Sequence, residues 1–419
     1  FLRRLFSYLF LPCNFCYTFV VNCIIAQKMV FGGDCIAKID GKTVFIEGGI
    51  LPGEKAEVET VVSKKDYDRA LVKKILIPDA ARRKAFCDFY GTCGGCNFQH
   101  ADYALQLELK KRIVEELLAR SFGSVPHECD TARVGAFPQL PDIKIVSGPE
   151  KEYRSRFQLH NGGLKKRNAD SVVFIDDCPC AVPVLRDFLR YKNTLKKSVV
   201  FPVPAERVSV CAAGDTVVTG RDAQTVRSVD IAGKRIFFDV NGFFQSNLFV
   251  LEQALPLITD GLCGKRLLDM YGGTGVLSLF AADKFEEVTI VESDEKPLAL
   301  AKRNYKENGI AEAPLTRAMH GKIWAKRRAQ TAGLFDAVIV DPPRTGIESA
   351  VIDYLCAAKP PVIRSLSCDP ATHARDLKKL LCAGYTISDF YLLDFYPQTS
   401  HIETLARLTF TKNKPERKL

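Results

Sequence analysis

Four short apolar runs in the second half of the chain end in polar residues and alternate with segments of helical character. The runs are KRLLDMY, EVTIVES, FDAVIVDPP and PPVIRSLS. Strands that are buried on both faces read as continuous apolar stretches, and their alternation with helices is typical of a doubly wound parallel sheet. Such sheets bind ligands in the crevice at the carboxyl ends of their strands. The sequence therefore predicts a Rossmann-like α/β domain over residues 241–419, with its site where these runs end.

The first run leads into a glycine-rich turn, LLDMYGGTGVLSL, and then into a predicted helix. Gly273 in this turn would let the backbone approach a ligand at the helix N-terminus. Glu292 ends the next run, where a carboxylate can accept hydrogen bonds from ribose hydroxyls. A nicotinamide cofactor would favour G-x-G-x-x-G, whereas this order of residues resembles S-adenosylmethionine-dependent methyltransferases. The alternative is a turn that only packs the strand against the helix.

Two further runs end in residues with reactive side chains. Asp341 ends FDAVIVDPP, where two prolines stiffen the turn so that the carboxylate points into the crevice; a rigid loop is the alternative. Cys368 ends the next run and stands directly before Asp-Pro. A free cysteine is most often a small buried hydrophobe, but a partly exposed thiol near a helix start becomes nucleophilic as its thiolate. Position alone leaves Cys368 as a packed thiol, a metal ligand or a nucleophile.

A second group of cysteines lies in CDFYGTCGGCNFQH, where Cys87, Cys93 and Cys96 have the spacing C-x5-C-x2-C. Three thiolates this close favour a soft metal, with Cys178 or Cys180 of FIDDCPCAVP as the fourth ligand. Zinc bound by four cysteines usually shows two C-x2-C pairs, whereas three clustered cysteines and a remote fourth are common for four-iron clusters. The spacing therefore favours iron–sulfur over zinc, and uncoordinated thiols remain the other alternative.

The stretch FYPQTSHIETLARL contains His401 and Glu403 directly before the last apolar strand of the chain. A carboxylate beside the crevice could serve as a general base. Considered alone, however, Glu403 is more readily interpreted as a surface charge, and His401 as a structural histidine with satisfied hydrogen bonds. The pattern by itself does not decide between these interpretations.

The first half of the chain predicts two smaller domains. Residues 27–80 alternate apolar and polar positions between glycine turns, which indicates an OB-like β-barrel of the type that often binds nucleic acid. A small β-domain with a solvated charged rim is the alternative. Residues 81–240 read as a mixed α+β domain that includes the cysteines, with a helix over residues 102–120.

Residues 1–26 form an apolar extension with the length of a membrane span, but Pro12 and Asn14 interrupt it. We expect this segment to come from an over-extended reading frame and to lie outside the fold, with a membrane anchor as the alternative. The odd number of 15 scattered cysteines favours reduced thiols in the cytoplasm. The net charge of +10 fits an anionic partner such as nucleic acid, although solubility alone would explain it.

Taken together and in this order, the motifs resemble those of the RNA 5-methyluridine methyltransferases, and within them the iron–sulfur enzymes of ribosomal RNA. The residues that carry this resemblance are CGGCNFQH, FFQSN, DMYGGTG, DPPRTG, SCDP and HIE, within about residues 27–412. The N-terminal β-domain looks like the TRAM domain, an RNA-binding barrel. The first 26 residues have no counterpart in the family.

The resemblance implies roles for residues that match the family's motifs. Cys368 of SCDP would be the nucleophile and Glu403 of HIE the base that removes the uracil C5 proton. The cofactor and uracil sites would be lined by Gln245, Tyr271, Gly273, Glu292 and Asp341. The cluster ligands would be Cys87, Cys93, Cys96 and Cys178, with Cys180 as a competitor for the fourth position.

These roles imply S-adenosylmethionine-dependent methylation of uridine C5 in RNA, with 23S ribosomal RNA as the expected substrate and a 4Fe-4S cluster as a second cofactor. We expect a cytoplasmic monomer without a membrane partner. The alternatives are methylation of transfer RNA or of another RNA position, and a non-catalytic RNA-binding iron–sulfur protein. Because methylation of an exocyclic amine needs no thiolate, the combination of Cys368 and Glu403 favours uridine C5.

Overall fold

The computed structural model describes residues 21–123, 141–195, 207–328 and 335–410, and the chain divides into two compact units at Arg82. Residues 1–20 of the predicted N-terminal extension lie outside the described ranges. No helix within these ranges is long and apolar enough to cross a membrane. Each unit is described separately below.

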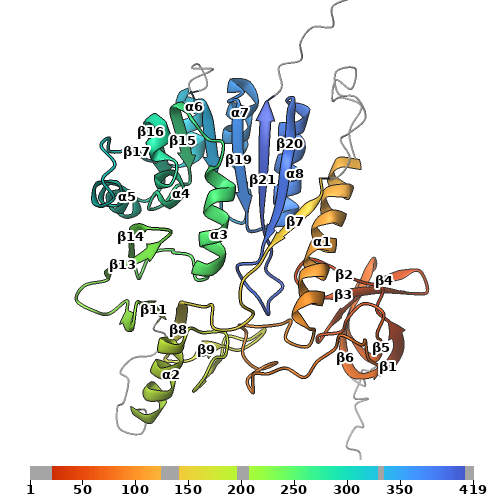
Figure 1. Ribbon diagram of the computed structural model, residues 1–419. Helices are drawn as coiled ribbons and strands as arrows, with labels where there is room; N and C mark the ends of the chain where they lie inside the picture. The colour runs from red at the N-terminus through yellow and green to blue at the C-terminus, as the bar shows by residue number, and fades with distance from the viewer. Residues whose placement is uncertain (1–20, 124–140, 196–206, 329–334, 411–419) are drawn as a thin grey trace, which may run out of the picture. The chain divides into compact units, whose positions relative to one another are not determined.

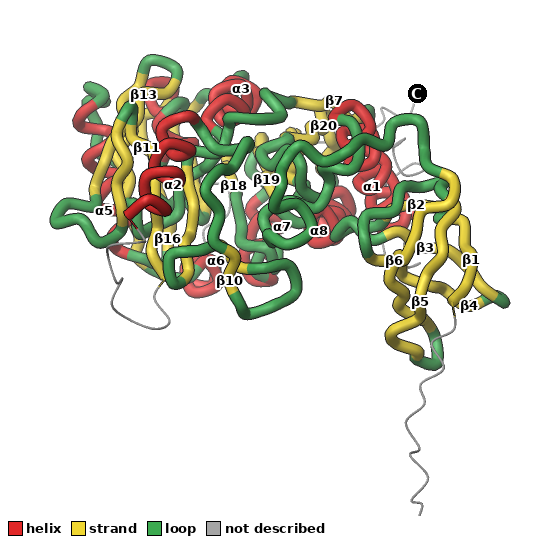
Figure 2. The backbone as a smooth tube through the Cα atoms, turned by 90° about the horizontal axis from the view of Figure 1, so that it is seen from below, coloured by secondary structure: helices red, strands yellow, loops and turns green. Residues whose placement is uncertain are grey.

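The first unit is a six-stranded sheet with the order β1-β5-β6-β4-β3-β2 (Figure 2). Its strands are β1 Val21–Ile25, β2 Lys28–Met29, β3 Cys35–Ile39, β4 Lys42–Glu47, β5 Lys55–Ser63 and β6 Tyr67–Ile77. Alternate positions face the core, so that Val44 and Ile46 of β4 are buried between partly exposed neighbours. Strand β1 pairs with β5, so the sheet begins inside the segment that the sequence assigns to an extension outside the fold.

Glu54 is a buried carboxylate that binds the last residues of the first unit. Its side chain is only 1% exposed and accepts hydrogen bonds from the backbone N–H groups of Leu51 and Asp79, and from the guanidinium of Arg82. These contacts satisfy a charge that would be costly to bury alone, and they lower the pKa of the Glu54 carboxyl. The last turn of this unit is therefore tied to its core by one ion pair.

The second unit is built on an eight-stranded sheet with the order β17-β16-β15-β18-β19-β21-β20-β7 (Figure 1). Its strands are β7 Ile143–Val146, β15 Gly264–Met270, β16 Phe285–Glu292, β17 Leu315–Ala318, β18 Ala337–Val340, β19 Val362–Ser367, β20 Tyr385–Leu393 and β21 Glu403–Phe410. All neighbouring pairs are parallel except those that β21 makes with β19 and β20. The four predicted strands are found here as β15, β16, β18 and β19, which confirms the predicted α/β sheet.

Helices pack on the large sheet as the apolar patterns predict. They are α1 Tyr103–Gly123, α3 Leu248–Thr259, α4 Val276–Leu279, α5 Glu295–Glu307, α6 Gly321–Arg328, α7 Ser349–Ala358 and α8 Pro370–Cys382, with one 3-10 turn η1 at Ala282–Lys284. Helix α8 contacts β19, β20 and β21, and α1 in turn packs on α8. Helix α8 begins with Asp369 as its N-cap and Pro370 in its first turn, which is why the chain turns sharply just after Cys368.

Smaller sheets occupy the segment between α1 and α3. They are formed by β8 Arg156–His160 with β11 Arg207–Ala213 and β12 Thr216–Thr219, by β9 Leu164–Lys165 with β10 Val172–Val173, and by β13 Val226–Ile231 with β14 Lys234–Asp239. Helix α2, Pro183–Leu195, contacts β11 and β12. Strand β7 belongs to this segment in sequence, yet it pairs with β20 in the large sheet. The central segment and the methyltransferase-like segment thus share one sheet and one compact unit.

Candidate active site and cysteine cavity

The strand register of the large sheet brings several predicted site residues to one edge. The strands β16, β15, β18 and β19 are parallel neighbours, and their carboxyl ends carry Glu292, Tyr271, Asp341 and Cys368. The strand order reverses between β15 and β18, because β16 and β17 continue to one side of β15 while β18 and β19 continue to the other. This switch point is where doubly wound sheets bind ligands.

Cys368 and Glu403 come together because β21 runs antiparallel to β19. The ladder pairs Ser367 with Thr404, so one further step of the same register sets Cys368 opposite Glu403. Directly opposed residues of an antiparallel pair have Cα atoms about 4.5–5.5 Å apart, and their side chains point to the same face. Two residues that are far apart in the sequence are therefore neighbours at the open end of the sheet.

The electrostatics of this edge are dominated by burial and by like charges. Burial, with smaller contributions from the carboxyls of Glu403 and Asp341, raises the pKa of the Cys368 thiol to about 11. Burial also raises the pKa of Glu403 to about 8 and that of Asp341 to about 7. Arg344 opposes the rise in the pKa of both Cys368 and Glu403. Groups whose pKa values lie this far from their usual range in one crevice are typical of sites that transfer protons.

Gln245 lies in the segment between β14 and α3, and its position points to a missing polar partner. Its side-chain Oε1 is buried and makes no hydrogen bond to any atom of the described residues. A buried amide oxygen without a partner is costly, so a group that donates a hydrogen bond to it would relieve that cost. This residue is therefore suited to hold a ligand that carries an N–H group.

The glycine turn has the shape of a cofactor cradle. Tyr271 has φ +63°, a left-handed conformation that non-glycine residues adopt rarely and mostly at functional sites. A Cβ atom at Gly273 would meet nothing within 4 Å, so the backbone there is open to a ligand. The Gly273 N–H donates to Glu292 Oε2 at 3.2 Å, which joins the turn to the acidic strand tip. These features fit S-adenosylmethionine, whose ribose and amino acid groups need carboxylate and backbone partners.

Several residues of this edge were not identified from the sequence. The Tyr271 hydroxyl lies 3.4 Å from Glu348 Oε2 and 3.3 Å from the Glu348 N–H, so Glu348 fixes the tyrosine ring. Arg344 is a cation whose charge acts against the raised pKa of both Cys368 and Glu403. Arg344 lies inside the DPPRTG motif and could have been found there, whereas Glu348 has no local signal. Desolvation lowers the pKa of the His401 imidazole to about 4, so this side chain is neutral near pH 7.

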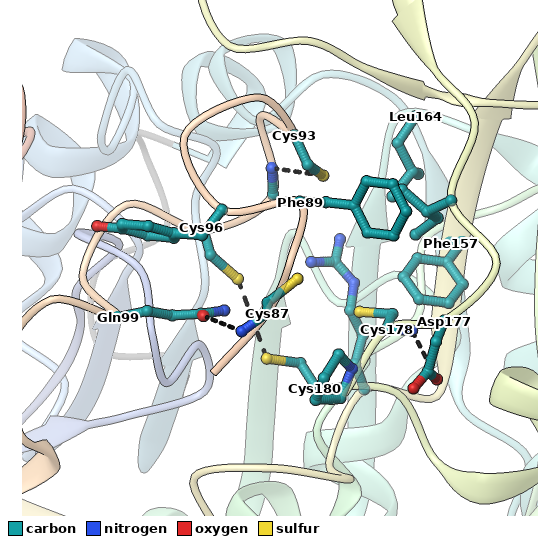
Figure 3. Close-up of a pocket in the computed structure, with 15 residues that line it drawn as sticks. Cys87, Phe89, Cys93, Cys96, Gln99, Phe157, Leu164, Asp177, Cys178 and Cys180 are labelled. Atoms are coloured by element: carbon teal, nitrogen blue, oxygen red, sulfur yellow. Dashed lines mark hydrogen bonds between the residues drawn. The ribbon is translucent and has the colours of Figure 1, made fainter. Parts of the chain in front are cut away.

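The cysteines of the first half gather in one cavity (Figure 3). Cys87, Cys93, Cys96, Cys178 and Cys180 all line it, together with the apolar side chains of Phe89, Phe157, Leu164 and Ile175. The cavity brings the trio together with both candidates for the fourth position. Within the described ranges, no three or more histidine, cysteine, aspartate or glutamate side chains converge on one point as ligands of a metal ion.

The two remote cysteines differ in their surroundings. Cys180 is only 2% exposed, and its Sγ lies 3.9 Å from Cys96 Sγ. Hydrogen bonds between Cys180 and its neighbours Cys178 and Cys96 raise the pKa of Cys180, and the same interaction lowers the pKa of Cys178 to about 7. Cys178 is thus the thiol that loses its proton more easily, and Cys180 is the one that retains it. Because metals bind thiolates, this contrast favours Cys178 over Cys180 as a ligand.

Comparison with known proteins agrees with this fold and site. The structure of a tRNA (uracil-54, C5)-methyltransferase from Pyrococcus abyssi, in complex with S-adenosyl-L-homocysteine, matches with a TM-score of 0.70 and 22% identity over 93% of this chain and 100% of that one. This chain therefore shares the fold of that protein. The family model described as tRNA (Uracil-5-)-methyltransferase matches residues 207–410.

Similar chains extend this match over nearly the whole sequence. An uncharacterized RNA methyltransferase from Treponema denticola is 38% identical over 92% of this chain and 98% of its own length. The 23S rRNA (uracil(1939)-C(5))-methyltransferase RlmD from Vibrio parahaemolyticus is 30% identical over 91% of this chain and 94% of its own length. This chain belongs to the RNA uracil-5 methyltransferase family, and it is an enzyme that uses S-adenosylmethionine to methylate uracil C5 in RNA.

Proposed function

We propose that the enzyme methylates uridine C5 in 23S ribosomal RNA through a covalent bond between Cys368 and uracil C6. The observation that supports this most directly is the β19–β21 register, which sets Cys368 opposite Glu403 one step beyond the Ser367–Thr404 pair, and the effect of Glu403 on the pKa of Cys368 agrees with it. A nucleophile and a base on the same face of one ladder suit a reaction in which a thiol adds and a proton then leaves.

The first step activates the uracil ring for methylation. Uracil C5 is too weak a nucleophile to take a methyl group unaided. The Cys368 thiolate adds to C6, and the electron pair of the C5–C6 double bond moves into the ring to form an enolate. Gln245 Oε1 would accept a hydrogen bond from the uracil N3–H and so hold the ring, which must first be flipped out of its stack. S-adenosylmethionine, when bound, would supply an electrophilic methyl group to C5 and would leave as S-adenosylhomocysteine, which keeps the electron pair of the broken sulfur–methyl bond.

The second step releases the product. Glu403 takes the proton from C5, and the electron pair of that C–H bond restores the C5–C6 double bond. The C6–S bond breaks at the same time and its electron pair returns to Cys368 as a thiolate. Because the pKa of Glu403 is raised to about 8, the carboxylate holds a proton more tightly than an exposed glutamate would, which suits a base that acts near neutral pH.

The cysteine cavity is proposed to hold a 4Fe-4S cluster on Cys87, Cys93, Cys96 and Cys178. Five soft donors and an apolar lining support this choice. The spacing of the cysteines, with three clustered and one remote, is commoner for four-iron clusters than for zinc bound by four cysteines. Purified without oxygen, the protein is expected to be brown and to contain iron rather than zinc by elemental analysis.

The choice of 23S ribosomal RNA rests on the cysteine set and on the relatives named RlmD. The six-stranded N-terminal sheet is proposed to act as a TRAM-like RNA-binding domain. The deciding experiment incubates the enzyme with labelled S-adenosylmethionine and transcripts of 23S ribosomal RNA and transfer RNA side by side, and then maps the product nucleotide. We expect 5-methyluridine in the 23S transcript alone. Methylation of transfer RNA alone would contradict the assignment of 23S ribosomal RNA as the substrate. A product other than 5-methyluridine would contradict the proposed mechanism.

A further inference from the structure

The loop that leads to Glu403 is unusually well buried. Residues 394–402 connect β20 to β21, and the pair Leu393–Glu403 closes the hairpin. Gln398 is 0% exposed and Asp394 1% exposed, although loops normally run over the surface. Since Glu403 is the first residue after this loop, its position depends on how the loop is held.

The cysteine loop holds one side of this hairpin. The N–H groups of Asn97 and Phe98 donate to the Gln398 carbonyl oxygen at 3.1 and 2.9 Å. The Asn97 side chain adds a reciprocal pair, because its Oδ1 accepts from the Ser400 N–H at 2.7 Å and its Nδ2 donates to Ser400 Oγ at 2.8 Å. Asn97 directly follows Cys96, which lines the cysteine cavity. Four hydrogen bonds therefore join the cysteine loop to the hairpin.

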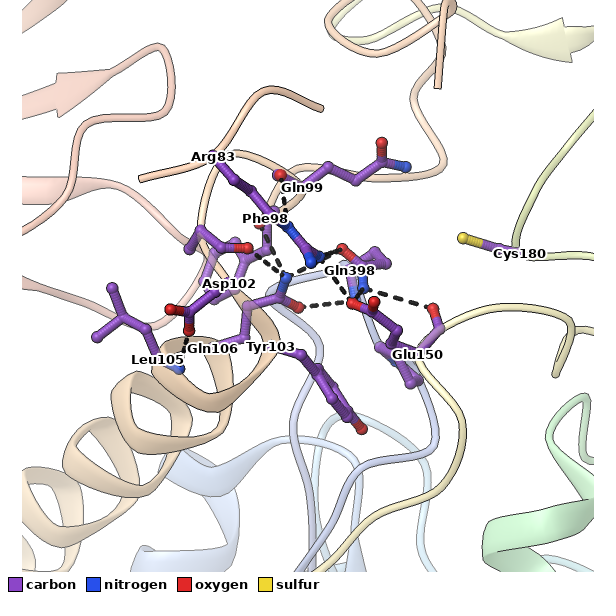
Figure 4. Close-up of polar contacts among 12 residues, drawn as sticks. Arg83, Phe98, Gln99, Asp102, Tyr103, Leu105, Gln106, Glu150, Cys180 and Gln398 are labelled. Carbon is purple, nitrogen blue, oxygen red and sulfur yellow. Dashed lines mark hydrogen bonds and ion pairs between the residues drawn. The ribbon is translucent and has the colours of Figure 1, made fainter. Parts of the chain in front are cut away.

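Helix α1 holds the other side. Gln106 and Lys110 lie one turn apart on this helix and are both 0% exposed. Gln106 faces Gln398 (Figure 4), where its Oε1 accepts from the Gln398 N–H at 3.0 Å and its Nε2 donates to Gln398 Oε1 at 2.9 Å. Lys110 pairs with Asp394 at 2.6 Å and donates to the Tyr396 carbonyl oxygen at 3.1 Å.

Gln398 is the centre of this network. Its φ is +67°, in the left-handed region that glutamine seldom adopts. Such a conformation persists only where the surroundings over-determine it. Here every polar atom of the residue is engaged, since its Nε2 also donates to Glu150 Oε2 at 3.1 Å and its Oε1 accepts from Arg83 at 3.2 Å.

Cys368 is anchored by separate contacts. The Asp369 side chain accepts from the N–H groups of Ala371 and Thr372 at the start of α8, and the Asp369 N–H donates to Ser367 Oγ. None of these three bonds involves the hairpin. Glu403 is linked to the thiol through the Ser367–Thr404 ladder pair, so a change in the hairpin should displace the base more than the thiol.

We infer that Asn97 and Gln398 are positioning residues that transmit the geometry of the cysteine loop to the hairpin and thereby set where the Glu403 carboxylate meets uracil C5. This role rests on the proposed function, because it concerns the step in which Glu403 removes the C5 proton. It assigns to the cysteine loop a task in product release: the loop holds the base, and the thiol addition proceeds without it.

The test measures two rates in single turnovers, namely formation and decay of the covalent protein–RNA adduct on denaturing gels. Asn97→Ala and Gln398→Ala are expected to form the adduct at close to the wild-type rate. Decay should slow by about 5- to 100-fold, because the lost hydrogen bonds hold the hairpin that positions Glu403, so that adduct accumulates. Asn97→Asp keeps the acceptor for the Ser400 N–H and should restore part of the decay rate.

Asn308→Ala is the matched control. The Asn308 side chain makes a similar reciprocal pair with the backbone of Arg235, at 2.9 and 2.7 Å, in a region away from the hairpin. Both rates should remain unchanged in this variant. If Gln398→Ala does not fold, Asn97→Ala, whose side chain is only partly buried, still decides the question.

The variant Glu403→Gln distinguishes a failure of the positioning role from a failure of the proposed mechanism. If that variant traps the adduct while Asn97→Ala releases it normally, the positioning role is wrong and the proposed mechanism stands. Equal slowing of formation and decay in Asn97→Ala would also overturn the positioning role, because it would indicate a general structural defect. If Glu403→Gln forms no adduct although it binds RNA, the proposed mechanism itself is wrong.

Discussion

The edge of the large sheet and the cysteine cavity both contain thiols, but the thiols have different neighbours, although burial raises the pKa of both Cys368 and the cavity residue Cys87 to about 11. At the sheet edge a single thiol, Cys368, is surrounded by carboxyls, and its pKa is raised to about 11. In the cavity several thiols share apolar surroundings, and the pKa of Cys178 is lowered to about 7. The first environment sets one thiol beside the carboxyl that is its proposed base, and the second gathers several thiols that could bind a metal jointly.

The largest effect is expected from removing the lone thiol. Cys368→Ala should abolish methyl transfer, because no other thiol of the described residues lies at the carboxyl edge of the sheet, and binding of S-adenosylhomocysteine should be unchanged. Methyl incorporation and calorimetry measure the two properties. Cys356→Ala is the matched control, since Cys356 is also a half-buried free thiol in the same unit and should be dispensable. Full turnover by Cys368→Ala would show that the thiol at the sheet edge does not react, and it would then not differ in function from the cavity thiols.

Removing the base should have the next largest effect. Glu403→Gln is expected to lower turnover by about 10²–10⁴-fold, the usual contribution of a general base, while a covalent adduct builds up. The adduct should migrate as a protein–RNA species on denaturing gels. Turnover at the wild-type rate would show that another group removes the proton.

Replacing single cysteines of the cavity should change the metal content of the protein. Cys93→Ala and Cys178→Ala are expected to lose iron, whereas Cys180→Ala should retain it, because Cys178 is the proposed fourth ligand. Elemental analysis and the visible absorption spectrum of protein purified without oxygen check this. Loss of iron in Cys180→Ala with retention in Cys178→Ala would reverse the assignment of the fourth ligand.

The smallest effect concerns pH. The thiolate fraction of Cys368 increases with pH up to its pKa of about 11, so adduct formation should rise by about tenfold per pH unit between pH 7 and 9. The negative charge of Glu403 disfavours the thiolate, so Glu403→Gln should lower the pKa of Cys368 and speed adduct formation at a given pH. Asp341→Asn should act in the same direction but more weakly. A profile that is flat in wild type would contradict the high pKa of this thiol.

Local patterns predicted the sheet well. KRLLDMY and EVTIVES coincide with β15 and β16 to within about two residues, because buried parallel strands have a strong apolar signal. The same reasoning missed the pairing of β7 with β20, since partners so distant in sequence leave no local trace. It also left β1 outside the fold, where the residues Val21–Ile25 pair with β5.

The candidate site was predicted where residues are chemically distinctive. Cys368, Glu403 and Asp341 stand at strand ends, and the register brings the first two together. Asp394 follows the same rule at the end of β20 and could have been recognised. Gln106 and Gln398 could not, because a neutral amide has no preferred sequence pattern and their pairing exists only in the folded chain.

Because β21 runs antiparallel between β19 and β20, the length of the loop that precedes it is constrained. One residue gained or lost within residues 394–402 that shifted the ladder would turn Glu403 to the opposite face, and two would move it along the strand by about 6–7 Å. Either change separates it from Cys368. Insertions elsewhere on the surface cost little, but this hairpin must keep its length, so it is a poor place for tags, fusions or engineered loops.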